Sequence, residues 1–232
     1  MPADRLHRLR IVVKAGTDGT KVLDRLTHPL LRGKEFSDTL SPVLSAIGLD
    51  ITEQLSFARP HNLLVEGISD HFYVNAFARI LRPTFLEKVN VFPGSGATTL
   101  PILASLFIGW GLRFGILLDR DEEGKKANAK LARDYAILPD RVVHPQDAIT
   151  IEDVFSPDDF RQLLAAADDD FTLDTGERPS ESIKRQGIDK VLLARIFAER
   201  VGAGNTQLTQ KTRNAAEKLL GAMLVACGAP VD

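Results

Sequence analysis

The sequence has little cysteine, no long apolar run and almost no net charge, and each of these absences excludes a class of protein. Cys227 is the only cysteine in 232 residues, which excludes a disulfide framework and a zinc site built from cysteines. No apolar stretch reaches the roughly 18 residues of a membrane span, and the first ten residues lack the apolar segment of a signal peptide. We therefore expect a cytoplasmic protein that makes no membrane contact.

The formal net charge of −2 is too small for a protein that binds nucleic acid by bulk electrostatic attraction, because such proteins are usually basic. It does not exclude a protein that reaches phosphates through bound cations, whose charge no composition includes. The contents of hydrophobic residues (44%) and charged residues (26%) are ordinary for a globular chain. We expect one good-sized domain with smaller additions.

From residue 62 onward, short apolar runs alternate with stretches of helical periodicity. The expected strands are 62–66, 89–92, 113–119 and 141–145, and the expected helices between them are 69–82, 97–111 and 122–136. Ser69 is the expected N-cap of the first helix. Strands that alternate with helices through short links predict an α/β fold, in which helices flank a parallel sheet on both faces.

The two ends of the chain follow other patterns. Residues 9–23 predict two strands around a turn, and a short helix is expected at 41–48. After residue 155 the periodicity predicts helices separated by a polar, mobile loop at 168–182. Three parts are expected, namely a linker or stub (1–58), a catalytic α/β domain (59–155) and a small helical subdomain packed on the sheet (156–232).

Six carboxylates follow the predicted strands or lie one helical turn beyond them. They are Glu66, Asp70, Asp119, Asp121, Glu152 and Asp153. Parallel strands present their carboxyl ends at the same edge of a sheet, so we expect these side chains to gather there. Any one of them alone is more often a helix cap or a turn residue, and the pair Asp119 and Asp121 could be a turn before the next helix.

Carboxylates that lie close together raise one another's pKa values unless cations offset their charge. Oxygen ligands select hard ions, so the sequence predicts Mg²⁺ or Mn²⁺. Two such ions about 3.5–4 Å apart can activate a water and stabilise the leaving oxygen when a phosphodiester is cleaved. Lys190 is expected to reach the cluster and stabilise charge on the phosphate, although a solvated helix lysine is the simpler interpretation.

The stretch "PGSGATTL" at 93–100 joins a strand to a helix, where backbone amides can face a phosphate. It lacks the lysine of a Walker loop, since Gly96 is followed by Ala97, Thr98 and Thr99. A phosphate-facing turn and an ordinary tight turn are equally compatible with this pattern.

Together, "LLVEGISDHFYV", "VFPGSGATTL", "GILLDRDEEGKKA" and "TIEDVF" resemble the TOPRIM domain, and most closely that of the OLD (overcoming lysogenisation defect) nucleases. In that family a TOPRIM domain follows an ABC-type ATPase, for which this chain has no Walker motif. The resemblance implies metal-dependent cleavage of DNA by two ions, with the missing ATPase as a partner. By position it implies catalytic roles for Glu66 and Lys190 and metal ligation by Glu66, Asp70, Asp119, Asp121, Glu152 and Asp153.

Two other classes remain open. A haloacid-dehalogenase-like phosphatase or phosphotransferase also carries Asp-x-Asp after an apolar strand, as in "ILLDRD". Such enzymes usually have Thr or Val where this chain has Glu123, and they use the first strand of the fold rather than the third. A non-catalytic, metal-stabilised regulatory module would gain stability from Mg²⁺ without turning over a substrate.

Overall fold

A computed structural model describes residues 11–14, 20–23, 61–109 and 111–231. The chain divides into two units, Met1–Ala58 and Arg59–Asp232. In the first unit, β1 (Ile11–Lys14) pairs antiparallel with β2 (Thr20–Leu23), which confirms the two predicted strands. The helix predicted at 41–48 lies outside the described residues, and the role of residues 1–58 as the stub of an ATPase stays a prediction.

The second unit is built on a four-stranded parallel sheet with the strand order β4-β3-β5-β6. Its strands are β3 (His61–Val65), β4 (Val89–Pro93), β5 (Phe114–Leu117) and β6 (Val142–Val143). β3 is buried along its whole length, as expected of a central strand that is covered on both faces. The predicted α/β fold is confirmed, and β6 is shorter than the predicted strand at 141–145.

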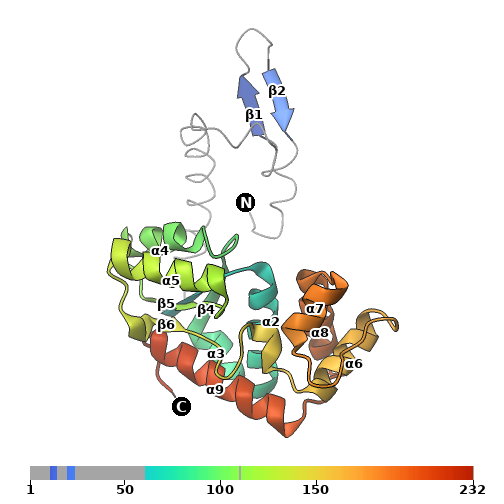
Figure 1. The fold of residues 1–232 in the computed structure, drawn as a ribbon. Helices are drawn as coiled ribbons and strands as arrows, with labels where there is room; N and C mark the ends of the chain where they lie inside the picture. Colours follow the sequence, from blue (N-terminus) through green and yellow to red (C-terminus); the bar gives the residue numbers. More distant parts are fainter. Residues whose placement is uncertain (1–10, 15–19, 24–60, 110, 232) are drawn as a thin grey trace. The chain divides into compact units, whose positions relative to one another are not determined.

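Helices cover both faces of the sheet, as predicted (Figure 1). On one face lie α2 (Ile68–Leu81) and α9 (Gln210–Ala226), and on the other lie α4 (Leu100–Gly109) and α5 (Glu122–Tyr135). The remaining helices are α3 (Pro83–Lys88), α6 (Pro157–Ala167), α7 (Pro179–Gln186) and α8 (Lys190–Gly202), with short 3₁₀ turns η5 (Pro139–Arg141) and η6 (Ile151–Val154).

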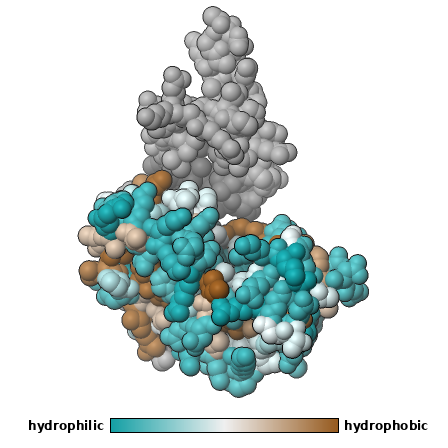
Figure 2. All heavy atoms as spheres, viewed as in Figure 1, coloured by the Kyte–Doolittle hydropathy of each residue, from teal (hydrophilic) through white to brown (hydrophobic). Residues whose placement is uncertain are grey.

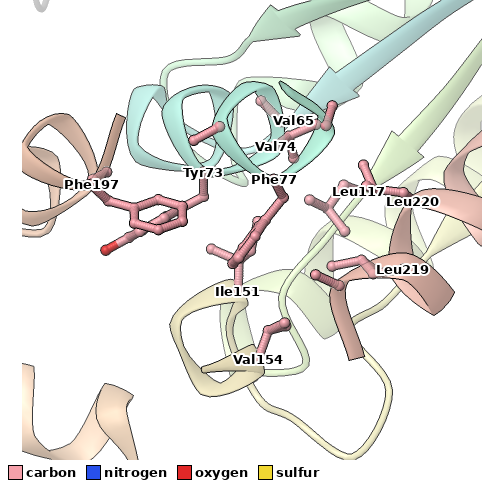
Figure 3. Packing of buried hydrophobic residues seen from close by; sticks show 14 of the residues in the cluster. Val65, Tyr73, Val74, Phe77, Leu117, Ile151, Val154, Phe197, Leu219 and Leu220 are labelled. Carbon is pink, nitrogen blue, oxygen red and sulfur yellow. The ribbon is translucent and has the colours of Figure 1, made fainter. Parts of the chain in front are cut away.

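Aromatic side chains join the late helices to the sheet layer in one hydrophobic core (Figure 3). Phe77 of α2 lies with its ring centroid 5.1 Å from those of both Phe155 and Phe197. Leu219 and Leu220 of α9 belong to the same buried cluster. Since α8 also packs along α2, the helices after residue 155 share a core with the sheet instead of forming a separate one.

Two local predictions were wrong, and one helix was not predicted. Ser69 is not the N-cap of α2; Gly67 is, because the Asp70 carboxylate accepts a hydrogen bond from the Gly67 amide (2.8 Å) and so begins the helix earlier. The loop predicted at 168–182 ends sooner, because α7 starts at Pro179, a residue favoured in the first helical turn. α3 was not predicted; it likewise begins at a proline, Pro83.

α4 is apolar on both its covered and its open sides. Leu100, Ala104 and Phe107 are buried, whereas Ile102 and Leu106 are exposed. Figure 2 shows apolar surface on the side of the second unit where α4 lies, while most of the visible face is hydrophilic. Within the part of the chain that the structure describes, no helix is long and apolar enough to cross a membrane.

Candidate functional site

The strand register places the predicted acids at one edge of the sheet. Val65, the last residue of β3, pairs with Leu117, the last residue of β5. Glu66 therefore follows β3 at the same edge as Asp119, two residues beyond the end of β5. A hydrogen bond from the Arg120 amide to the carbonyl of Ile149 (2.7 Å) ties the loop after β5 to the segment that leads into η6. The third acidic segment is thereby brought to the first two.

Three of these acids are almost completely buried. The exposed fractions are 6% for Asp70, 8% for Asp119 and 1% for Glu152. Both carboxylate oxygens of Glu152, and Oε2 of Glu66, lack a hydrogen-bond partner among the described residues. Buried carboxylates without partners are costly, and native proteins normally pair them with cations or hydrogen-bond donors.

Burial and mutual repulsion raise the pKa values of the clustered acids. Burial, followed by the charge of Glu152, raises the pKa of Asp70 to about 7. The pKa of Asp119 rises to about 9, mainly through burial and then through the charges of Asp70 and Glu152. The pKa of Glu66 is raised by burial and by Asp121, although the Asp119 backbone amide acts in the opposite direction. These mutual effects show that the acids lie within electrostatic reach of one another.

Lys190 brings a positive charge to the edge of this cluster. It is the first residue of α8, and its Nζ lies 3.7 Å from Oε2 of Glu152. Burial lowers the pKa of Lys190, but the nearby carboxylates outweigh this effect, so the net direction is upward. Lys190 is therefore a charged residue that lies beside the buried Glu152, with a side chain that is half-exposed.

Two predicted ligands have structural partners of their own. Asp121 is the N-cap of α5, where its Oδ1 accepts a hydrogen bond from the Gly124 amide (2.8 Å). Asp153 accepts hydrogen bonds from the amides of Ile149 and Thr150 and from both the amide and the hydroxyl of Ser180. The helix-cap interpretation thus holds for one oxygen of Asp121, Oδ1. With both oxygens of Asp153 engaged, its role is to hold the η6 turn and α7 in place.

The glycine turn after β4 is held by internal hydrogen bonds. The amides of Gly94 and Gly96 donate to the carbonyls of Val65 (2.8 Å) and Glu66 (2.9 Å), and the Ser95 amide donates to Thr99 Oγ1 (3.2 Å). These donors are already used, which favours the tight-turn interpretation over a phosphate loop. The Gly96 amide of this turn holds the backbone carbonyl of Glu66 in place.

Among the described residues, no three histidine, cysteine, aspartate or glutamate side chains already converge into a finished ion site. The acids form a group of neighbouring, repelling charges, and an ion between them would require side-chain rotation. Oε2 of Glu66 and both oxygens of Glu152 have no hydrogen-bond partner among the described residues, so these oxygens can move without breaking a hydrogen bond. An all-oxygen set of this kind fits Mg²⁺ or Mn²⁺.

Two residues of the site escaped the sequence analysis. Glu123 is exposed, yet its charge contributes to raising the pKa of Glu66. The recurrence of acids at 119, 121 and 123 was a signal that could have found it. Tyr73 is buried beside the cluster, and burial together with the charges of Glu152 and Asp70 raises its pKa well above the usual value. Helical periodicity identifies it only as a core residue.

Gly124 allows α5 to pack directly on the loop that carries Asp119. A Cβ at this position would collide with the Asp119 carbonyl oxygen, lie 2.9 Å from its carbonyl carbon and approach Asp121 Oδ1 at 3.4 Å. Because backbone atoms cannot rotate away, Gly124→Ala should displace the loop and lower the free energy of unfolding by about 1–3 kcal/mol. Urea unfolding followed by circular dichroism measures this loss.

Gly221→Ala is the matched control. Gly221 lies inside α9, and a Cβ there would approach only Arg82 Nη1, at 4.0 Å. Alanine is favoured over glycine within a helix by roughly 0.5–1 kcal/mol, so this variant should be as stable as the wild type or more so. Equal stability of Gly124→Ala and wild type would show that the loop adapts and that the close approach is unimportant.

No protein-family model matches this chain, and no curated protein matches it in sequence. The structure is similar to the C-terminal region of the Burkholderia pseudomallei OLD protein (19% identity, TM-score 0.48), over 71% of this chain and 98% of that chain. It is also similar to the C-terminal region of the Xanthomonas campestris pv. campestris OLD protein (17% identity, TM-score 0.46), over 72% and 97%. These are proteins of the family that the sequence motifs resemble.

Proposed function

We propose that the second unit is a metal-dependent endonuclease that cleaves DNA phosphodiesters with two Mg²⁺ or Mn²⁺ ions. One observation carries the proposal: buried carboxylates from three segments meet at one sheet edge with oxygens that have no hydrogen-bond partner among the described residues. The proposed ligands are Glu66, Asp70, Asp119, Asp121 and Glu152. Asp153 is left out because its oxygens accept hydrogen bonds from the protein.

Cations explain why so many acids are buried together. The raised pKa values of Asp70 and Asp119 reflect the cost of ionising them first in a buried place and then beside other carboxylates, without a counter-charge. Lys190 offsets this charge only in part, since its Nζ lies near Glu152 at one side of the cluster. Divalent ions would supply the remaining positive charge and would also attract the phosphates that a chain of net charge −2 otherwise repels.

The residues divide into those that hold the ions and those placed to act on the phosphate. When bound, the two ions would activate a water and stabilise the leaving oxygen. Glu66 is only partly buried and has one unpartnered oxygen, so it is placed to accept a proton from an attacking water. Lys190 keeps its charge and is placed to stabilise the negative charge that develops on the scissile phosphate.

A phosphatase of the haloacid-dehalogenase type fits the arrangement less well. Its nucleophilic aspartate follows the first strand of the fold, whereas Asp119 follows β5, the third strand of this sheet in chain order. With its pKa raised to about 9, Asp119 is also a poor nucleophile near neutral pH unless a cation is present. A regulatory module would bind the metal ion without turning over a substrate, whereas the nuclease proposal predicts that DNA is cleaved.

Supercoiled plasmid incubated with the purified chain tests the proposal. We expect conversion to nicked or linear DNA with Mg²⁺ or Mn²⁺ and none with EDTA. p-Nitrophenyl phosphate, a phosphomonoester, should not be hydrolysed under the same conditions. Turnover of the monoester with intact plasmid would favour the phosphatase, and metal-induced stabilisation without turnover of either substrate would favour the regulatory module.

A further inference from the structure

The hydroxyl group of Tyr73 is buried in an aromatic cluster. Its ring centroid lies 5.6 Å from that of Phe155, 5.9 Å from that of Phe197 and 6.5 Å from that of Phe77, which fixes the ring between α2 and α8. Figure 3 shows the hydroxyl oxygen on the α8 side of this group. In the part of the chain that is described, this oxygen has no hydrogen-bond partner.

A buried hydroxyl without a partner is costly, so one that is kept in a core usually has a use. Tyr73 lies three residues after Asp70 in α2, which places both side chains on one face of the helix. The charges of Glu152 and Asp70 both reach the hydroxyl, since each raises its pKa. The Tyr73 hydroxyl, which can donate a hydrogen bond, thus lies within electrostatic reach of two buried carboxylates that can accept one.

Glu152 is the better of the two acceptors. Asp70 already accepts a hydrogen bond from the Gly67 amide, whereas neither oxygen of Glu152 has a hydrogen-bond partner among the described residues. We propose that Tyr73 is a positioning residue of the acidic cluster: when a cation draws one oxygen of Glu152, the Tyr73 hydroxyl donates a hydrogen bond to the other oxygen and holds the carboxylate in that orientation. This inference rests on the proposed metal-dependent function.

The surroundings of Glu152 explain why a hydrogen bond from Tyr73 would matter for its orientation. Glu152 lies in the short η6 turn, and its hydrocarbon chain alone does not fix where its oxygens point. Lys190 attracts the carboxylate towards α8 across 3.7 Å, in competition with a cation. A neutral donor on the rigid α2 would hold the carboxylate in place without adding charge, which is how partners of metal ligands usually act.

Metal binding by a Tyr73→Phe variant tests the role without relying on activity. The substitution keeps the ring and removes only the hydroxyl, so we expect Mn²⁺ affinity, measured by titration calorimetry, to fall about 10-fold or more. Thermal unfolding of the metal-free variant should be unchanged or slightly higher, because an unpartnered buried hydroxyl is lost. Tyr135→Phe is the matched control: it removes the only other tyrosine, at the end of α5, and should bind Mn²⁺ like the wild type.

Ultraviolet resonance Raman spectroscopy of the Tyr135→Phe protein observes the contact directly, because Tyr73 is then the only tyrosine. The intensity of the higher-frequency band of the tyrosine Fermi doublet, divided by that of the lower-frequency band, falls as the hydroxyl becomes a stronger hydrogen-bond donor. We expect donor character to appear when Mg²⁺ is added and to be weaker after a further Glu152→Gln substitution.

The outcomes separate this inference from the proposed function. Wild-type affinity for Mn²⁺ in Tyr73→Phe, or a doublet that responds to neither Mg²⁺ nor Glu152→Gln, would overturn the role of Tyr73 and leave the metal centre standing. Failure of the wild type itself to bind Mn²⁺ would overturn the centre and the positioning role together.

Discussion

Replacing Asp119 with asparagine is expected to abolish metal-dependent nicking of plasmid DNA and, at the same time, to make the metal-free chain more stable. Loss of a partner of a metal ligand typically lowers activity 10–100-fold, so loss of a ligand itself should lower it by at least about 100-fold. The stability gain follows from the pKa of Asp119, raised to about 9 by burial and by Asp70 and Glu152. Asparagine keeps the shape of the side chain and is uncharged without taking up a proton, whereas Asp119 must be held protonated far above its ordinary pKa of 3.8.

The opposite signs of these two effects make the experiment decisive. At pH 8 the gain in the free energy of unfolding should be about 1 kcal/mol or more, since each unit of pKa shift corresponds to about 1.4 kcal/mol. Plasmid nicking with Mg²⁺ and urea unfolding in EDTA provide the two measurements. Asp169→Asn, in an exposed segment between α6 and α7, is the matched control and should change neither.

Two contrary results would be informative. Nicking at the wild-type rate by Asp119→Asn would exclude Asp119 as a ligand. Loss of nicking together with a marked loss of stability would show that the Asp119 carboxylate supports the fold, and the missing activity would then say nothing about metal binding.

The acidic edge could be predicted from sequence because it depends on local patterns. Short apolar strands alternate with helices, and the acids Glu66 and Asp119 lie one and two residues beyond the ends of two of those strands, so sheet topology alone brings them together. This prediction does not require knowing the order of the strands in the sheet, because every strand of a parallel sheet has its carboxyl end at the same edge.

The roles of other residues depend on contacts between distant parts of the chain, which local patterns do not contain. Asp153 has the spacing of a metal ligand, but Ser180, 27 residues later, donates two hydrogen bonds to it. Tyr73 has the spacing of a core residue, and only the folded chain brings its hydroxyl within electrostatic reach of Glu152. In both cases residues far away in the sequence, and not the local pattern, decide what surrounds the side chain.

The same electrostatics predict an unusual pH dependence of stability for the metal-free chain. Asp70 and Asp119 have ordinary pKa values of 3.8 when the chain is unfolded, and about 7 and about 9 when it is folded. The folded state therefore holds more protons than the unfolded state across this range, so the free energy of unfolding should fall as pH rises from about 4 to 9. Lys190, with its pKa raised above 10.5, stays charged throughout and does not change the sign.

Urea midpoints at pH 5, 7 and 9, in EDTA and in saturating Mg²⁺, measure this dependence. In EDTA we expect a progressive fall, with the upper part between pH 7 and 9 lost in Asp119→Asn because that variant lacks the group that titrates there. With Mg²⁺ the fall should disappear or reverse, since a cation binds the ionised carboxylates and competes with protons for them. A flat or rising profile in EDTA would mean that the acids do not repel one another in the folded chain, and the electrostatic reason for a cation at this sheet edge would then be lost.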